Sequence, residues 1–225
     1  MTTDEKLRAF YEAMLARLGP QGWWPAETPF EVVIGAILTQ NTNWKNVERA
    51  IANLKREGLL DPRALDAVDA DRLGEIIRPA GYYRIKARRL KNLMRLLAER
   101  FDARLDALFA LPTADLRETV LAVAGIGPET ADSILLYAAG RPVFVVDAYT
   151  ARILYRHGLI ESAATYEDLQ SLFHGALAED TGLYQEYHAL LVAVGKNFCR
   201  KRAPQCEECP LGPLLEAGQP VTEIV

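Results

Sequence analysis

Apolar residues recur every three or four positions along nearly the whole chain, and this spacing restricts the fold more than any other feature. The first such stretch predicts a helix that ends near Gly19-Pro20 and carries five apolar residues on one face: Leu7, Phe10, Tyr11, Met14 and Leu18. Only residues 143–146, VFVV, look extended, and this segment is too short and isolated to build a sheet. The pattern therefore predicts an all-α fold of about ten helices.

Residues that cap helices mark several of the expected helix starts. Asp61-Pro62 is typical of an N-cap with proline at the first helical position, and Asp69 precedes a short helical segment. Thr113 stands before another helical pattern. Thr165 with Asp168 resembles a capping box, in which two residues satisfy each other's backbone N–H groups at a helix start.

The chain of 225 residues, of which 50% are hydrophobic, can bury the core of one large domain or of two modest ones. The best candidate boundary is Gly140-Arg141-Pro142, where a glycine ends a helix and a proline prevents its continuation. A weaker boundary lies around residues 22–25. No apolar run is long enough for a membrane span and the N-terminal segment is not a signal peptide, so we expect a cytoplasmic protein.

Charge is distributed unevenly along the chain. The formal net charge of −4 argues mildly against a polyanionic partner, because nucleic-acid-binding domains are more often basic. However, residues 84–104 carry eight basic residues against two acidic ones, and a second basic cluster surrounds the first cysteine: Lys196, Arg200, Lys201 and Arg202. Taken alone, each of these two basic segments is typical of a helix face exposed to solvent.

A tight turn, Gly125-Ile126-Gly127, separates a helix that we expect to end near Ala124 from one that begins at Pro128. Glycines allow positive φ and close approach of the backbone, and the first N–H groups of the second helix lie at the positive end of its dipole. Such a helix-hairpin-helix can bind an anion, for which a DNA phosphate is the natural candidate. The alternative is a helical hairpin whose glycines only permit close packing.

Four segments together resemble one known family. VAGIGPETA at 123–131, FVVDAYTARI at 144–153, the C-terminal cysteines, and TPFEVVIGAILTQNTNWKNVERA at 28–50 are similar to the endonuclease III branch of the helix-hairpin-helix, Gly/Pro, Asp family of DNA glycosylases. The segments cover most of the chain and follow in the family's order. They are much more specific together than the glycine turn alone.

The resemblance implies a monomeric enzyme of two helical domains that acts on damaged bases in double-stranded DNA, which it binds in a cleft between the domains. A six-helix barrel would span residues 23–140, and residues 1–22 plus 141–225 would form the second domain. Residues Gly125, Ile126 and Gly127 would hold phosphate.

The resemblance also assigns DNA contacts outside the turn. Gln40 would fill the gap left by the flipped base; the alternative is a polar residue at a helix end. Arg200 and Lys201 would face phosphate.

Asp147 matches the catalytic aspartate of the family, and it is also a good N-cap for the helical pattern that follows. Cleavage of an N-glycosidic bond passes through an oxocarbenium-like sugar, which a nearby carboxylate stabilises. The same carboxylate can orient or deprotonate the attacking water. Both roles can belong to one residue.

Glu129 departs from the family pattern. The bifunctional members of the branch have a lysine here, which attacks the sugar, forms a Schiff base and permits strand cleavage. A glutamate cannot form an imine, so the resemblance implies a monofunctional glycosylase that leaves an abasic site. A pyrimidine-damage glycosylase with weak lyase activity, and a noncatalytic helix-hairpin-helix protein that binds lesions, are the alternatives.

The segments around Trp24 and Trp44, together with the glutamate at position 129, are similar to the 3-methyladenine glycosylases of this branch. That match places Trp24, Trp44, Glu129 and Lys196 at the base pocket, where aromatic faces and a carboxylate would attract a cationic methylated purine. Tryptophans are also frequent core residues, and Lys196 could meet only phosphate or solvent. A mismatch-adenine glycosylase is disfavoured because Ala36 stands where that group has its catalytic glutamate.

The spacing Cys199-x6-Cys206-x2-Cys209 reproduces three of the four ligands of the family's [4Fe-4S] loop, here residues 199–215. Leu215 occupies the place of the fourth cysteine, and the chain has no other cysteine. Three possibilities follow: a cluster with a fourth ligand of another kind, a different metal such as zinc, or a loop held by packing alone.

Overall fold

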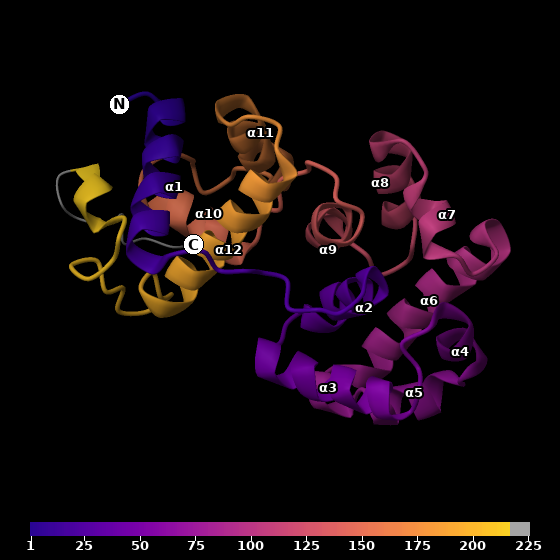
Figure 1. Ribbon diagram of the computed structural model, residues 1–225. Coiled ribbons are helices and arrows are strands. Elements are labelled where there is room, and N and C mark those ends of the chain that lie inside the picture. Colours follow the sequence, from indigo (N-terminus) through magenta and orange to yellow (C-terminus); the bar gives the residue numbers. More distant parts are fainter. Residues whose placement is uncertain (217–225) are drawn as a thin grey trace. The chain divides into compact units, whose positions relative to one another are not determined.

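The computed structural model describes residues 1–216, and all regular structure within them is helical, which confirms the all-α prediction. The α-helices run from α1 to α12, more than the ten expected, because short helices such as α7 (Leu105–Phe109) leave little periodicity in the sequence. The chain divides into two compact units (Figure 1). We call residues 24–141 the hairpin unit, and residues 1–23 with those from 142 onward the aspartate unit.

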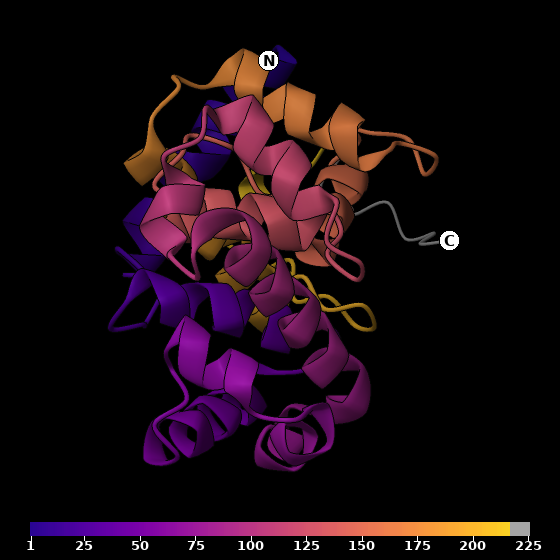
Figure 2. The same cartoon turned by 90° about the vertical axis from the view of Figure 1, so that its right-hand side faces the viewer.

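The hairpin unit is built around α2 (Pro29–Thr39), whose side chains from Phe30 to Leu38 are all buried. Helix α2 packs against α3 (Trp44–Arg56), α6 (Tyr83–Phe101) and the π-helical turn η2 (Ile134–Ala138). The remaining elements are α4 (Pro62–Ala67), α5 (Ala70–Ile76), η1 (Arg78–Ala80), α7, α8 (Thr113–Leu121) and α9 (Pro128–Ser133). In Figure 2 the violet helices α4 and α5 lie against the longer α6.

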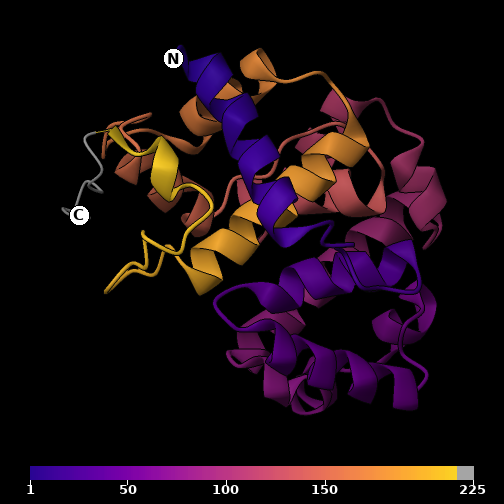
Figure 3. The ribbon, with the colours of Figure 1, turned by 60° about the vertical axis from the view of Figure 1, so that its left-hand side comes forward.

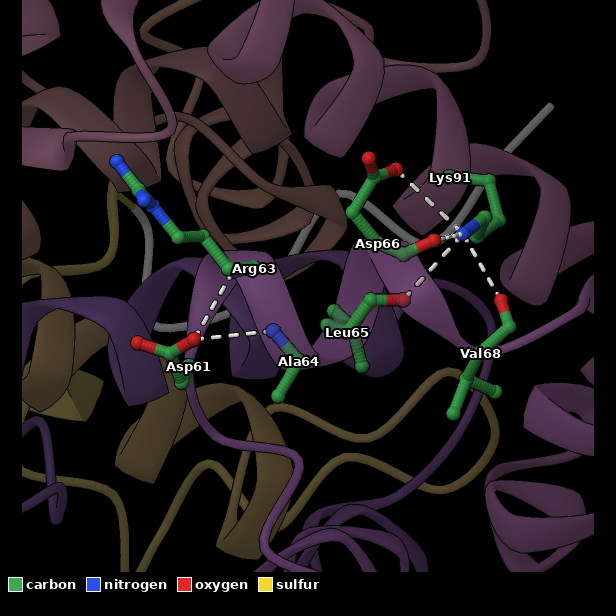
Figure 4. A network of polar contacts seen from close by, with 7 residues as sticks. All are labelled: Asp61, Arg63, Ala64, Leu65, Asp66, Val68 and Lys91. Atoms are coloured by element: carbon green, nitrogen blue, oxygen red, sulfur yellow. Dashed lines mark hydrogen bonds and ion pairs between the residues drawn. The ribbon is translucent and has the colours of Figure 1, made fainter.

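Four of the five predicted caps are confirmed, including that of Asp147, which is described with the candidate site. The Asp61 carboxylate accepts the backbone N–H groups of Arg63 and Ala64 at 3.0 Å each (Figure 4), and Asp69 caps α5 in the same way. The capping box of Thr165 and Asp168 begins α11 (Tyr166–Ala176). The prediction for Thr113 is wrong: this residue is already helical, and Pro112, which precedes it, has no side chain that can cap.

Part of the basic segment 84–104 donates hydrogen bonds to backbone carbonyl oxygens of the hairpin unit. The Lys91 ammonium donates to the carbonyl oxygens of Leu65 at 3.4 Å, of Val68 at 2.9 Å and of Asp66, all at the end of α4 (Figure 4).

Lys86 is buried and donates to the carbonyls of Leu38 at 2.9 Å and Ala80 at 2.7 Å. Burial, together with the nearby Arg89 charge, lowers the pKa of Lys86 to about 8. The segment is therefore not one continuous charged face.

The aspartate unit packs α1 (Thr3–Leu18) against α11 and α12 (Thr181–Asn197), and α10 (Ala148–Arg156) against α12. Figure 3 shows the indigo α1 crossing the orange α12. The 3-10 helix η3 (Gly212–Leu214) closes the described chain. As predicted, α1 ends just before Gly19.

The extended segment 143–146 lies buried in the aspartate unit without belonging to a sheet. Side chains of α11, rather than a neighbouring strand, form hydrogen bonds with the backbone of this segment. The N–H of Phe144 donates to Nε2 of His174 at 3.0 Å, and its carbonyl accepts from Gln170 at 2.7 Å. The Phe144 ring stacks on Phe173 with centroids 3.8 Å apart. This anchoring fixes the backbone that leads directly into Asp147.

Within residues 1–216, no helix combines the length and apolar character needed to cross a membrane.

Candidate functional site

Asp147 is the N-cap of α10, and its two carboxylate oxygens have different surroundings. Oδ1 accepts the backbone N–H of Thr150 at 2.7 Å and the Thr150 hydroxyl at 2.8 Å. Oδ2 lies 3.9 Å from Nε2 of His188 on α12, and only 11% of the Asp147 side chain is exposed. One oxygen therefore serves the helix, while the other is held in a nearly buried setting.

Among residues 1–216, His188 is the only side chain that could form an ion pair with Asp147, because no lysine or arginine there pairs with this carboxylate. Burial lowers the pKa of His188, an effect that the Asp147 carboxylate opposes. A neutral imidazole leaves the carboxylate charge uncompensated. Such a carboxylate can stabilise positive charge that develops during a reaction.

Sequence reasoning did not single out His188. The available signal was a polar residue on the otherwise apolar face of a helix, next to Tyr184, Tyr187 and Leu191, which are all buried. That signal is weak, because a histidine at such a position is more often a satisfied core residue.

The two glycines of the turn have different structural requirements. Gly125 has φ of +95°, and a Cβ there would lie 2.5 Å from Cγ of Arg89. Gly127 has an ordinary φ of −96° and nothing within 4 Å of a Cβ, and it is exposed. The fold therefore needs glycine at 125, whereas nothing within the described residues requires it at 127.

The first helix of the hairpin is shorter than expected. Helix α8 ends at Leu121, not near Ala124, because the chain already turns at Val123, whose carbonyl accepts the N–H of Ile126 at 3.0 Å. The side chain of Ile126 is buried and anchors the turn. Helix α9 has no side-chain cap, and its start carries the positive end of the helix dipole, which favours an anion.

Gln40, at the C-terminal end of α2, is tied to this hairpin. Its amide nitrogen donates to the Thr130 hydroxyl at 2.9 Å and to the Gly125 carbonyl at 3.3 Å. Its amide oxygen accepts from Arg89, the residue that also covers Gly125. To fill a gap in DNA, as predicted, the side chain would have to exchange these contacts for contacts with DNA.

Trp24 and Trp44 come together in the hairpin unit, edge to face with ring centroids 5.5 Å apart. Tyr137 joins them, 5.3 Å from Trp24. Gly35 permits this packing, since a Cβ there would lie 3.2 Å from the Trp24 indole. Tyr137 was not predicted as a site residue: it lies on the π-helical turn η2, a local widening that often marks functional sites and that the sequence does not signal.

Four further predicted site residues are exposed: Glu129, Lys196, Arg200 and Lys201. Glu129 lies in the first turn of α9 in the hairpin unit, and its backbone carbonyl accepts the Ser133 hydroxyl at 2.7 Å. Lys196 lies near the end of α12 in the aspartate unit, on the helix that also carries His188. Arg200 and Lys201 follow it, with their carbonyls held by Arg156 at 2.7 and 3.2 Å.

The three cysteines line one cavity in the aspartate unit, together with Arg156 and Leu215. Arg156 donates to Sγ of Cys199 at 3.2 Å. Burial raises the pKa of the Cys206 thiol and raises that of Cys209 to about 11, so both thiols stay protonated near neutral pH unless a metal binds.

In the described part of the chain, no three His, Cys, Asp or Glu side chains converge on a site for a single metal ion. A [4Fe-4S] cluster is larger and holds its ligands further apart. The three thiols that could hold one line a single cavity together with Leu215.

Comparisons with known proteins agree with this geometry. The model of the HhH-GPD superfamily of base excision DNA repair proteins matches residues 34–179. A putative DNA repair glycosylase of Methanocaldococcus jannaschii is 50% identical over 208 residues, which cover 92% of this chain and 94% of that protein. Endonuclease III of Thermotoga maritima is 30% identical over 181 residues, covering 80% and 79%.

Two solved structures extend the comparison. The 3-methyladenine DNA glycosylase of H. pylori bound to 1,N6-ethenoadenine has a TM-score of 0.76 and 29% identity, over 87% of this chain and 98% of that one. A non-covalent complex of endonuclease III with DNA has a TM-score of 0.82 over 97% of each chain. At 23% identity this second likeness concerns the fold alone.

Proposed function

Because this chain belongs to the HhH-GPD superfamily of base excision DNA repair proteins and is a DNA glycosylase, we propose that it hydrolyses the N-glycosidic bond of a flipped-out alkylated purine, such as 3-methyladenine. The observation that carries the proposal is Asp147. One oxygen of its carboxylate caps α10, and the other is nearly buried beside His188 with no cationic partner in residues 1–216.

In the proposed reaction the sugar of the flipped nucleotide lies against Oδ2 of Asp147. As the glycosidic bond lengthens, positive charge develops on the sugar, and the carboxylate stabilises this charged sugar more than it stabilises the uncharged sugar of the bound substrate. The same oxygen accepts a proton from the attacking water, so the base leaves and an abasic site remains. His188 lies 3.9 Å from this oxygen, and the two hydrogen bonds from Thr150 to Oδ1 hold the carboxylate in place.

DNA binding is assigned to the turn and to the C-terminal basic residues. We place one phosphate against Gly127 and the uncapped start of α9, and others near Arg200 and Lys201, which are exposed. Gln40 is proposed to fill the gap left by the base. The barrel over 23–140, the second domain, a monomeric state and a cytoplasmic location stay predictions.

The three cysteines are proposed to hold a [4Fe-4S] cluster, for which Cys199, Cys206 and Cys209 supply three thiolates. When bound, the cluster would order residues 199–215 and so fix the backbone that carries Arg200 and Lys201. The hydrolytic step uses residues outside this loop.

We expect no Schiff base between this protein and DNA, because Glu129 occupies the place of the attacking lysine. Borohydride added during turnover should trap no covalent protein–DNA adduct, while a lysine-bearing endonuclease III assayed in parallel gives one. A Glu129→Lys variant tests whether a lysine at this position can attack the sugar, and it should form the adduct. An adduct with the unaltered protein would contradict monofunctional hydrolysis and favour the pyrimidine-damage alternative.

A panel of oligonucleotides tests the substrate class, with base release scored separately from strand cleavage. The duplexes carry 3-methyladenine, hypoxanthine, a uracil mismatch or an oxidised pyrimidine. We expect the fastest release from 3-methyladenine, because Trp24, Trp44 and Tyr137 present aromatic faces that attract a cationic base. Faster release of the oxidised pyrimidine would overturn this assignment, and binding without release of any base would favour a noncatalytic protein.

Substitution of Trp44 gives a sharper form of the same test. Trp44→Leu should slow release of 3-methyladenine about five-fold more than release of neutral hypoxanthine, because a cation–π contact contributes on the order of 1 kcal/mol. Phe101→Leu, a half-buried ring at the end of α6 and outside this cluster, is the control and should affect both bases equally. Equal losses for Trp44→Leu would mean that Trp44 only supports packing.

A further inference from the structure

The proposed cluster lacks one protein ligand. Three cysteine thiols surround the cavity, and the fourth cysteine of the usual spacing is replaced by Leu215, whose side chain has no lone pair to donate. The fourth iron of a cluster bound here must therefore take a different ligand. The side chains that line the cavity decide which ligands are available.

His157 lines the same cavity as the three cysteines. It follows the last residue of α10, and only 7% of it is exposed. Its Nδ1 atom is buried and has no hydrogen-bond partner in residues 1–216. A buried ring nitrogen without a partner is costly, and ligation of a metal would remove that cost.

The other side chains around the cavity cannot take this role. The guanidinium of Arg156 has no lone pair to offer, and it already donates to Cys199. The rest of the lining, apart from the cysteines and His157, is apolar or glycine: Ile153, Val194, Phe198, Leu211, Gly212 and Leu215. Among the described residues at the cavity, His157 is thus the one non-cysteine ligand.

His157 and Leu215, the residue in the place of the fourth cysteine, line the same cavity. Burial, together with the neighbouring Lys6 charge, lowers the pKa of His157 to about 4.

We propose that His157 is the fourth ligand of a [4Fe-4S] cluster whose other ligands are Cys199, Cys206 and Cys209. This inference rests on the proposed cluster and not on the proposed base chemistry. With His157 as the fourth ligand, the loop needs no cysteine at position 215.

The test compares four proteins purified anaerobically and reconstituted with ⁵⁷Fe²⁺ and sulfide: the unaltered chain, His157→Ala, Leu215→Cys and the double variant. Iron per chain is counted by native mass spectrometry, and the iron sites are distinguished by Mössbauer spectroscopy. The unaltered protein should hold four irons, one of which differs from the three thiolate-bound ones. His157→Ala should lose that iron, and the double variant should regain it with four similar sites.

Leu215→Cys alone keeps His157 and so remains informative if His157→Ala does not fold. Its introduced thiolate should replace the histidine, and the distinct iron site should disappear. The inference is overturned if the unaltered protein binds no cluster, if its four irons are already alike, or if His157→Ala keeps the distinct site. Base release, measured on the same samples, reports separately on the proposed glycosylase reaction.

Discussion

Asp147→Asn should lower the rate of base release by about 10²–10³-fold and leave both folding and DNA binding intact. The magnitude follows from the loss of one preorganised charge at the place where positive charge develops. Asparagine caps helices as well as aspartate does, so the contact between the side-chain oxygen and the Thr150 N–H survives. Single-turnover release from a 3-methyladenine duplex, with binding measured by fluorescence anisotropy, checks both parts.

A matched control separates catalysis from capping. Asp180 caps α12 in the same unit by accepting the Leu183 N–H at 2.6 Å, as Asp147 caps α10. Asp180→Asn makes the same chemical change at a cap and should leave base release within about two-fold of the unaltered rate, because exposed surface substitutions have small effects. Equal rates for the two variants would remove Asp147 from the reaction.

The second large effect concerns the turn, where the two glycines should respond in opposite ways to the same substitution. Gly125→Ala should lower the free energy of unfolding by about 2–4 kcal/mol, because alanine at φ of +95° is strained and its Cβ would overlap Arg89. Gly127→Ala should change that free energy by less than about 1 kcal/mol, since its φ is ordinary and the space is open.

DNA affinity should show the complementary pattern. Gly127→Ala should weaken binding to a lesion duplex about ten-fold, because the added methyl group separates the backbone N–H groups at the start of α9 from a phosphate. Urea unfolding and anisotropy titrations on both variants provide the two measurements. If Gly127→Ala binds DNA normally, the phosphate lies elsewhere and the glycine has no role that we can assign.

Local chemistry explains why much of the fold was predictable. Helix starts at Asp61, Asp69 and Thr165 depend on contacts between residues two or three positions apart, which the sequence displays directly. The start near Thr113 was misplaced by one residue, because Pro112 takes the cap position without a capping side chain. The segment 143–146 looked extended, but its partners on α11 are more than twenty positions away and left no local signal.

The candidate site likewise contains residues that the sequence indicated and residues that it did not. Asp147 was predicted both as an N-cap and, from family resemblance, as the catalytic carboxylate; the cap is observed, and the catalytic role stays a proposal. His188 and Tyr137 escaped prediction because each lies on a helix surface whose neighbours come from distant segments. The basic segment 84–104 suggested one charged face, yet Lys86 and Lys91 are used to satisfy carbonyl oxygens.

The sequence by itself determined the helical class, most helix starts, the glycine turn and the absence of a lysine at position 129, because these depend on residue identity and near neighbours. The tertiary structure decided which glycine the fold requires, which oxygen of Asp147 caps α10, and which histidine reaches the cysteine cavity. Each of these depends on side chains from separate helices that packing alone brings within a few ångströms. His157 shows this most directly, since more than forty residues separate it from Cys199 in the chain.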